Sequence, residues 1–362
     1  MDYEGRLARL QHDLASTGLD ALLVSHLPNI RYLCGFTGSA AALFVSKPKV
    51  VFFTDGRYKQ QAHQEAQGAR IVVARRPPAI MAAEWVKSNR KKLGVKMLGF
   101  DSQHLSVAEH IQLAEILRPD VRLRKAPSFV ERARMVKDED EIGLLRAAIR
   151  LGESLFGVAV KTIRPGIAET EVAAEMEYAA RHAGAEGMSF ETIVASGRRS
   201  ALPHGRATIA PIPSKGFVVC DFGIILAGYC SDMTRTVHVG EPSEEARCMY
   251  AAAREAEEAA IGAIKPGVPL GKIDSVARNV LTKQGFGRYF THSTGHGVGL
   301  EIHEMPRIAS RQSEPLLAGM VITIEPGVYI PSIGGVRIED MVLVTNIGCE
   351  VLTQTSKELL VI

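Results

Sequence analysis

Four carboxylates interrupt stretches of the C-terminal half that are otherwise apolar. An ionised carboxylate is costly to bury alone, so each one requires a cation, hydrogen-bond donors or a solvent-filled pocket. Two of them lie in GFVVCDFGIILAGYCSDMTRTVHV (216–239) and two in MVITIEPGVYIPSIGGVRIEDMVLVT (320–345). They are Asp221, Asp232, Glu325 and Glu339.

Each of these stretches is predicted to form a β-hairpin. In the first, a turn at 226/227 places Asp221 opposite Asp232, and a turn at 227/228 places them diagonally. Both registers leave the two side chains on one face, because side chains alternate along a strand. Like charges a few ångströms apart repel by about 332/(ε·r), or several kcal/mol. A positive group must therefore lie nearby; an ion pair of Asp232 with Arg235 is the alternative to a metal.

Three histidines lie close together in THSTGHGVGLEIHE, residues 291–304. The middle one, His296, lies between Gly295 and Gly297, which we expect to leave room for the backbone to approach a metal. With the four carboxylates it completes a set of five donors, which suits two divalent ions that share bridging carboxylates. No His-Glu-x-x-His pattern occurs, which disfavours a single-zinc protease of that type. A lone histidine is more often a core residue; the order Asp, Asp, His, Glu, Glu favours a metal centre.

An α/β domain is predicted in the N-terminal part of the chain, before the elements that position these residues. Residues 21–25, 41–45, 50–54, 70–74 and 97–101 are predicted strands, and residues 79–92 and 105–117 are predicted helices. The pattern breaks between 124 and 136, where Pro127 lies, and a long amphipathic helix is predicted from about Asp138. The predicted domains are 1–127 and 128–362.

The second domain contains an internal repeat. IRPGIAETEVAAEMEYAARHAG (163–184) and IKPGVPLGKIDSVARNVLTKQG (264–285) align without a gap. Each copy turns at Pro-Gly, continues as a helix and ends at a glycine suited to a helix C-terminus. Two copies about 101 residues apart are too few and too distant for a solenoid. We therefore expect a pseudo-twofold domain in which paired helices pack on a sheet.

Composition excludes several classes of protein. The 362 residues suit two domains, and 43 Lys and Arg against 40 Asp and Glu give no basic surface for nucleic acid. The N-terminus lacks the features of a signal peptide and no segment suits a membrane span, so a cytoplasmic protein without membrane contact is expected. The five cysteines are predicted to be small buried side chains, because their number is odd and their spacing matches no metal motif.

The spacing of these residues resembles that of the pita-bread fold metallopeptidases of family M24, in the branch of Xaa-Pro aminopeptidase and Xaa-Pro dipeptidase (prolidase). In that pattern one histidine precedes the ligand histidine by four positions and another follows it by seven, as His292 and His303 do around His296, before Glu304. The resemblance covers the whole chain. It implies a two-domain α/β fold, with an N-terminal creatinase/prolidase-like α/β domain and a C-terminal pita-bread α+β catalytic domain with the pseudo-twofold duplication.

The resemblance also implies roles for the donors. Asp221 binds the first of two divalent ions, Asp232 and Glu339 bridge both, and His296 and Glu325 complete the second. The ions are manganese or cobalt, with zinc or iron as alternatives, and they activate water as the nucleophile. Glu325 moves a proton from that water to the leaving nitrogen of proline. Three histidines bind the substrate: His303 and His204 also stabilise the tetrahedral intermediate, and His292 lines the proline pocket.

Two arginines are candidate substrate-site residues. Arg337 precedes Glu339 by two positions, and we expect its guanidinium to neutralise the carboxylates. Arg307 can bind the free carboxylate of proline in a dipeptide; its alternative role is that of a solvated loop charge.

The resemblance implies a proline-specific hydrolase that acts on short peptides with proline in the second position. It further implies a homodimer in which residues 31–39 approach the neighbouring active site. The segments RYLCGFTGSAA and FFTDGRY favour an aminopeptidase, and a dipeptidase is the alternative. A metal-free peptide-binding relative is a remote alternative, because such proteins, like creatinase, lack the ligands that are all present here. Methionine aminopeptidase shares the ligands but has no counterpart of the first 125 or so residues, which disfavours that function.

Overall fold

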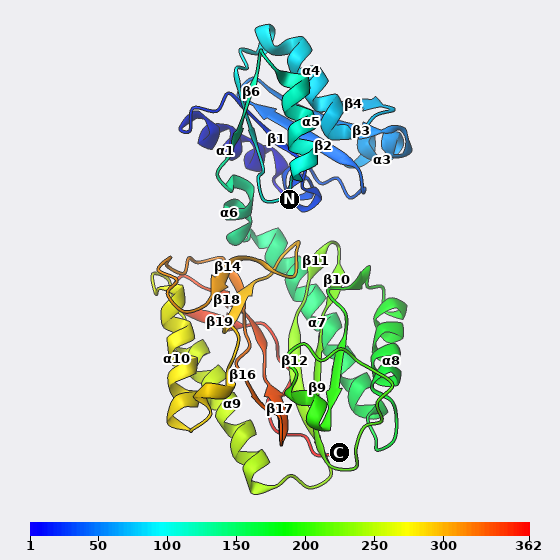
Figure 1. Cartoon of the computed structure of the whole chain (residues 1–362), viewed down its shortest axis with the longest axis vertical. Coiled ribbons are helices and arrows are strands. Elements are labelled where there is room, and N and C mark those ends of the chain that lie inside the picture. The colour runs from blue at the N-terminus through cyan, green and yellow to red at the C-terminus, as the bar shows by residue number, and fades with distance from the viewer. The chain divides into compact units, whose positions relative to one another are not determined.

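The computed structural model describes residues 1–362 and divides the chain into two compact units, Met1–Arg134 and Met135–Ile362 (Figure 1). Each unit has its own sheets and its own core. None of the helices combines the length and apolar character that crossing a membrane requires.

The first unit is built on a six-stranded mixed sheet in the order β4-β3-β2-β1-β5-β6. Strands β1 to β3 form antiparallel pairs, while β4, β5 and β6 are added in parallel. Strands β1 and β2 are buried throughout, as expected for a sheet covered on both faces. The strands are β1 (Ala21–Val24), β2 (Ala41–Ser46), β3 (Lys49–Asp55), β4 (Arg70–Ala74), β5 (Met97–Phe100) and β6 (Arg122–Lys125).

The five strands predicted for this unit are confirmed, whereas β6 is an addition. Its sequence, RLRK, is mostly exposed and lacks the apolar run that identifies a buried strand. Three short helices, α2, α3 and α6, were also not predicted, whereas α1 agrees with the helical spacing of Leu7, Leu10 and Leu14. The helices are α1 (Tyr3–Ala15), α2 (Leu27–Cys34), α3 (Lys59–Glu65), α4 (Pro78–Leu93), α5 (Val107–Leu117) and α6 (Phe129–Met135).

The second unit contains two pairs of long helices on either side of its strands (Figure 1). The first helix begins after Asp138, whose carboxylate accepts a hydrogen bond from the Glu141 amide at 2.9 Å, as a helix N-cap does. The pairs are α7 (Glu139–Thr162) with α8 (Glu169–His182), and α9 (Glu244–Gly262) with α10 (Leu270–Lys283). Helices α8 and α10 each have 14 residues and begin 101 positions apart, so the predicted duplication is confirmed.

The strands of this unit repeat the same plan in each half. In the first half the sheet order is β12-β9-β8, and in the second half β13, β15 and β18 are three neighbours of a five-stranded sheet. The first set is β7 (Gly187–Met188), β8 (Ile193–Ser196), β9 (Gly216–Phe222), β10 (Ile224–Leu226), β11 (Tyr229–Cys230) and β12 (Met233–Val239). The second set is β13 (Gly295–Gly297), β14 (Glu304–Ile308), β15 (Val321–Ile324), β16 (Gly327–Ile330), β17 (Gly334–Arg337), β18 (Asp340–Val344) and β19 (Cys349–Val351).

Both predicted hairpins are present, and each is interrupted partway along. In the first, Leu226 pairs with Tyr229 and the same register pairs Asp221 with Thr234. The turn therefore lies at 227/228, and Asp221 is diagonal to Asp232, the second of the two predicted registers. In the second hairpin, one register runs through β15–β18 and β16–β17, and it places Glu325 opposite Glu339 at the interruption.

Candidate metal centre

The five predicted ligands converge in the second unit. Donor atoms of Asp232, His296 and Glu339 lie within 4.8 Å of one another. The His296 Nε2 atom lies 3.5 Å from Asp232 Oδ2 and 3.5 Å from Glu325 Oε1. The first hairpin contributes Asp221 and Asp232, and the second half contributes the other three, so the centre lies where the duplicated halves meet.

Three of the four carboxylates occupy interruptions of the strand ladders. Asp232 falls between β11 and β12, Glu325 between β15 and β16, and Glu339 between β17 and β18. The backbone amides find partners on other strands: Glu325 N donates to Thr294 O at 2.8 Å, and Glu339 N donates to Thr234 O at 3.2 Å. The interruptions thus free the carboxylates from the regular alternation of a strand without leaving these amides unpaired.

Burial of so many acidic groups raises their affinity for protons. Burial, then repulsion from Glu339, Asp221 and Glu325, raises the pKa of Asp232 well above its usual range. Burial likewise raises the pKa of Glu339 well above its usual range, with repulsion from Glu325 and Asp221 adding to it. Burial raises the pKa of Glu325 to about 7. Without further cations, these carboxylates are under pressure to be protonated.

Arg337 is the guanidinium that contacts the carboxylate cluster. Its Nη2 donates to Asp221 Oδ2 at 2.5 Å, and its Nη1 donates to the Tyr329 hydroxyl at 2.6 Å and to the Pro203 carbonyl at 3.0 Å. Its Nε donates at 3.1 Å to the Thr234 hydroxyl, which itself donates to Glu339 at 2.7 Å. One buried guanidinium thus faces four carboxylates, and it offsets only part of their charge.

The neighbouring histidines are held in the neutral form. Burial and then the nearby His303 lower the pKa of His296 to about 4. Burial also lowers the pKa of His292 to about 4. A neutral imidazole is the form that ligates a metal or accepts a proton. The His296 Nδ1 atom lies 3.1 Å from the Gly297 carbonyl, which leaves Nε2 towards the carboxylates.

The remaining predicted histidines lie around the ligand set. The His303 ring lies edge-on to that of His296, with centroids 4.4 Å apart. Burial lowers the pKa of His303, and repulsion from the exposed His204 adds to this effect and to the effect at His292. His292 Nε2 lies 2.9 Å from the Tyr329 hydroxyl. The structure therefore brings all four histidines to one region.

Arg307 also comes close to this region through strand pairing. It lies on β14, where its backbone pairs with that of His296, and its side chain is exposed. No ion pair involves its guanidinium. Its charge is thus available to a bound anion.

Three expectations about individual residues need correction. Arg235 pairs with Asp340 at 2.7 Å rather than with Asp232, because its side chain points to the opposite face of β12. The space left by Gly295 and Gly297 is filled by the backbone of Thr323 and Met305, so these glycines permit close strand packing rather than access to a metal. Of the cysteines predicted to be buried, Cys248 is exposed on the solvent side of α9 and Cys349 is only partly buried on β19.

Sequence reasoning missed the hydroxyl groups that support the site. Tyr329 connects Arg337 to His292, and Thr323 donates to Glu325 at 3.5 Å and accepts from the His296 amide at 3.1 Å. Tyr329 could have been identified from the sequence, because it lies four residues after Glu325 and side chains an even number of residues apart lie on the same face of a strand. Thr234 gives a similar signal, since it follows Asp232 by two.

The donor set fits divalent cations. Two ligand atoms at about 2.3 Å from one ion lie no more than about 4.6 Å apart, which is close to the observed spread of the Asp232, His296 and Glu339 donors. Four carboxylates and one imidazole supply hard and borderline ligands, and one guanidinium leaves negative charge to be neutralised.

Comparisons with known proteins agree with this assignment of chemistry. A model of the metallopeptidase family M24 matches residues 143–346, and a model of the creatinase/prolidase N-terminal domain matches residues 6–136. The Xaa-Pro dipeptidase of Pyrococcus horikoshii is 37% identical over 354 residues, which cover 94% of this chain and 95% of the relative.

Two solved structures extend the likeness to the whole fold. The Xaa-Pro dipeptidase from Bacillus anthracis has a TM-score of 0.95 at 40% identity, covering 99% of this chain and 100% of that one. The X-Pro aminopeptidase from Thermotoga maritima has a TM-score of 0.88 at 37% identity, also covering 99% and 100%. Fold and site together define a two-domain metal-dependent hydrolase. The chain belongs to metallopeptidase family M24.

Proposed function

We propose that this protein is a Xaa-Pro dipeptidase that depends on two divalent metal ions. The observation that carries the proposal is the convergence of three buried carboxylates, the partly buried Glu325 and His296 on one region with a single compensating guanidinium. Asp221, Asp232, His296, Glu325 and Glu339 are the proposed ligands. Manganese or cobalt is the proposed metal, and a homodimer is the proposed assembly.

The metals, when bound, polarise the scissile carbonyl and lower the pKa of water. The residues of the chain do the rest. Glu325, whose pKa burial raises to about 7, is suited to take a proton from water and pass it to the proline nitrogen. His204 and the neutral His303, whose pKa burial lowers, donate hydrogen bonds to the oxygen on which charge develops, and His292 lines the proline pocket.

A dedicated site is needed because the bond before proline lacks an N–H group. Peptidases that bind extended peptides through backbone N–H groups lose one of those contacts there. The proline ring must instead be recognised by shape, and His292, held by the Tyr329 hydroxyl at 2.9 Å, is the proposed residue that contacts it.

The preference for a dipeptidase over an aminopeptidase has two supports. Proteins named as Xaa-Pro dipeptidases include the Bacillus anthracis structure, whose TM-score of 0.95 exceeds the 0.88 of the Thermotoga maritima aminopeptidase. In addition, the backbone of Arg307 pairs with that of His296 and its side chain is exposed, so its guanidinium is the proposed partner of the free carboxylate of a dipeptide. The comparisons thus favour the alternative over the aminopeptidase that the N-terminal segments suggested.

A comparison of an Xaa-Pro dipeptide with the tripeptide that extends it by one residue tests the proposal. We expect kcat/KM for the dipeptide to exceed that for the tripeptide by at least 100-fold, since only the dipeptide places a carboxylate on proline; 100-fold equals about 2.7 kcal/mol. Arg307→Met should reduce this ratio mainly through KM for the dipeptide.

The second candidate, an Xaa-Pro aminopeptidase, is supported by the 37% identity to the Thermotoga maritima enzyme over nearly the full chain. Equal or better cleavage of the tripeptide would establish this candidate and refute the first. Cleavage of neither peptide by protein with two bound ions would refute both.

A further inference from the structure

The two halves of the catalytic unit meet at a narrow backbone contact beside the proposed ligands. Thr234 of β12 and Glu339 form an isolated antiparallel bridge between the sheets of the two halves. Asp232 lies two residues before this bridge, and Glu339 is part of it. The separation between ligands of the first and second halves therefore depends on what fixes this contact.

Arg235 fixes the contact from the face opposite the ligands. Its Nη1 donates to the carbonyls of Thr234 at 2.9 Å and Glu339 at 2.7 Å, and its Nη2 donates to Asp340 Oδ1 at 2.7 Å. The side chains of Arg235 and Asp340 are 1% and 0% exposed, so this ion pair is fully desolvated. One guanidinium thus joins β12 of the first half to the backbone of a proposed ligand in the second.

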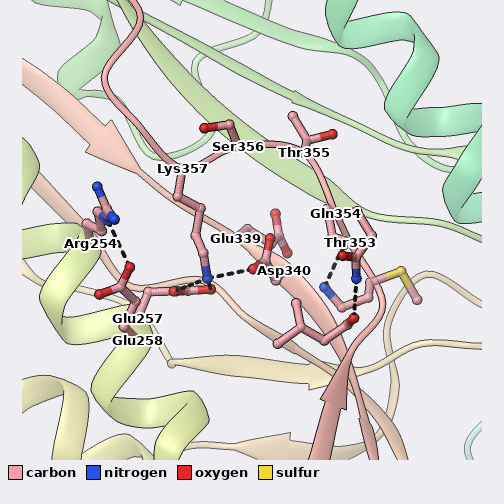
Figure 2. A network of polar contacts seen from close by, with 12 residues as sticks. Arg254, Glu257, Glu258, Glu339, Asp340, Thr353, Gln354, Thr355, Ser356 and Lys357 are labelled. Carbon is pink, nitrogen blue, oxygen red and sulfur yellow. Dashed lines mark hydrogen bonds and ion pairs between the residues drawn. The ribbon is translucent and has the colours of Figure 1, made fainter.

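A second cation reaches the same carboxylate from the C-terminal segment. Figure 2 shows Lys357 between Asp340 and Glu257 of helix α9. Its Nζ lies 2.8 Å from Asp340 Oδ2 and 2.8 Å from Glu257 Oε2, and both carboxylates are 0% exposed. Together Arg235, Asp340, Lys357 and Glu257 form a network of two basic and two acidic side chains, in which Lys357 is 20% exposed and the other three are buried.

The C-terminal segment is attached to this network at more than one point. Arg235 Nη2 donates to the Thr355 carbonyl at 2.6 Å, and Arg235 Nε donates to the Ser356 carbonyl at 3.1 Å. Asp340 follows Glu339 directly in the chain. A change at Asp340 that displaces its backbone, or that displaces Arg235, therefore also displaces the backbone of Glu339.

We propose that Lys357 is a positioning residue for the metal centre: it fixes Asp340, and through it the Arg235 contact that sets Glu339 against the first half. This inference rests on the proposed function, because it assumes that Glu339 and Asp232 bind metal. The ion network does not touch the reacting atoms. Its effect is on how well the five donors are arranged before the ions bind.

The chain offers a matched control in Arg254, which lies one turn before Glu257 on α9. Arg254 pairs with Glu258 at 2.8 Å and with Glu358 at 2.6 Å, so it too ties α9 to the C-terminal segment. Figure 2 shows that its pair with Glu258 points away from Asp340. Lys357→Met and Arg254→Met thus each remove one cation between the same two elements, and only the first removes a contact to Asp340.

The experiment measures manganese binding to chelator-treated full-length protein by calorimetry. We expect Lys357→Met to weaken manganese affinity at least tenfold, Arg254→Met to change it less than twofold, and Lys357→Arg to restore it to within threefold of the native value. At saturating manganese, Lys357→Met should recover most of the native kcat. Native-like affinity in Lys357→Met, or equal losses in Lys357→Met and Arg254→Met, would overturn the inference.

If Lys357→Met does not fold, the same manganese-binding measurement is made on a second pair of variants. Asp340→Asn and Glu257→Gln each neutralise one carboxylate that contacts Lys357 with little change in size. The inference requires weaker manganese binding in Asp340→Asn alone, and equal effects contradict it. Failure of the native protein to bind any divalent ion would instead refute the proposed function.

Discussion

Two clusters of the same residue types lie in the two units of the chain. Asp101, His104 and Glu131 form one in the first unit, and Asp232, His296 and Glu339 form the other in the second. In each, the donor atoms lie within 4.8 Å of one another. Distance alone does not distinguish them, so the difference must come from their surroundings.

The cluster of the first unit is satisfied by the protein itself. The side-chain amide of Asn29 donates to Glu131 at 2.6 Å and to Asp101 at 3.2 Å, and the amide oxygen accepts from Arg134 at 2.8 Å. His104 is exposed. A buried amide thus cross-links the two carboxylates, which is the arrangement expected of a structural network.

The cluster of the second unit has no equivalent of Asn29. Asp232 and Glu339 are 5% and 2% exposed, and the Thr234 hydroxyl and the Arg337 guanidinium are the side-chain donors near them. The comparison teaches that a metal centre is recognised by charge left uncompensated at buried donors, rather than by the donors' proximity.

The largest effect that the comparison predicts is on catalysis. Asp232→Asn should lower kcat/KM by about 10³-fold or more, because Asp232 is a proposed metal ligand and its loss would remove several kcal/mol of electrostatic stabilisation. Metal content should fall below two ions per chain, as measured by elemental analysis. Turnover within tenfold of native in this variant would contradict the dinuclear assignment.

Metal removal should have the next largest effect, on stability as well as activity. A chelator should abolish turnover, and manganese or cobalt should restore it. Ions that bind the native state alone stabilise it by about 4 kcal/mol at 1,000 times their Kd. The melting temperature should therefore rise with manganese concentration in calorimetry; turnover that resists the chelator would count against a metallopeptidase.

The pH dependence of the metal-free protein sharpens the comparison further. Glu325, with a folded pKa of about 7 against an ordinary 4.5, contributes stability below pH 4.5 that is lost as pH rises through 7. The pKa values of Asp232 and Glu339, raised mainly by burial, and that of Glu257, raised to about 8 by burial, act in the same direction.

Histidines act in the opposite direction over a different range. The folded pKa values of His292 and His296, about 4 against an ordinary 6.5, contribute stability that is complete above pH 6.5 and lost as pH falls to 4. Because the contribution of His292 and His296 is complete above pH 6.5, the raised pKa values of the carboxylates determine how stability changes between pH 6.5 and 8. The melting temperature of the metal-free protein should therefore fall as pH rises from 6.5 to 8, and saturating manganese should make this fall smaller. A melting temperature that rises over the same interval in the presence of chelator would contradict the charge balance described.

The smallest effect is expected in the first unit. Asp101→Asn should leave metal content and kcat/KM within twofold of native, because Asn29 rather than an ion joins the carboxylates there. Burial, followed by repulsion from Glu131, raises the pKa of Asp101, so neutralising this residue should not lower the melting temperature. A drop in metal content would show that the two clusters are alike after all.

Much of this organisation follows from local sequence patterns. Apolar runs between turn residues predicted the strands of the first unit, and the gapless repeat predicted the pairing of α7 with α8 and of α9 with α10. Alternation limited the first hairpin to two registers, one of which is found. The five donors were identifiable because charged residues on apolar strands require compensation.

Contacts between distant segments could not be predicted in this way. Asp340 and Lys357 are ordinary charged residues in sequence, and their pairing with Arg235 and Glu257 depends on how the C-terminal segment packs. The same is true of Asn29 with Glu131, which are 102 positions apart. The roles of Gly295 and Gly297 were misjudged because a glycine signals close approach without identifying what approaches.

The division of the ligands between two halves has a consequence for biosynthesis. Asp221 and Asp232 leave the ribosome before His296, Glu325 and Glu339 have been made, and Arg337 comes later still. During that interval the two aspartates must remain hydrated or protonated, since no partner yet exists for them. On the proposed assignment the complete set of five ligands exists only late in synthesis, so metal loading would follow translation of the first half rather than guide its folding.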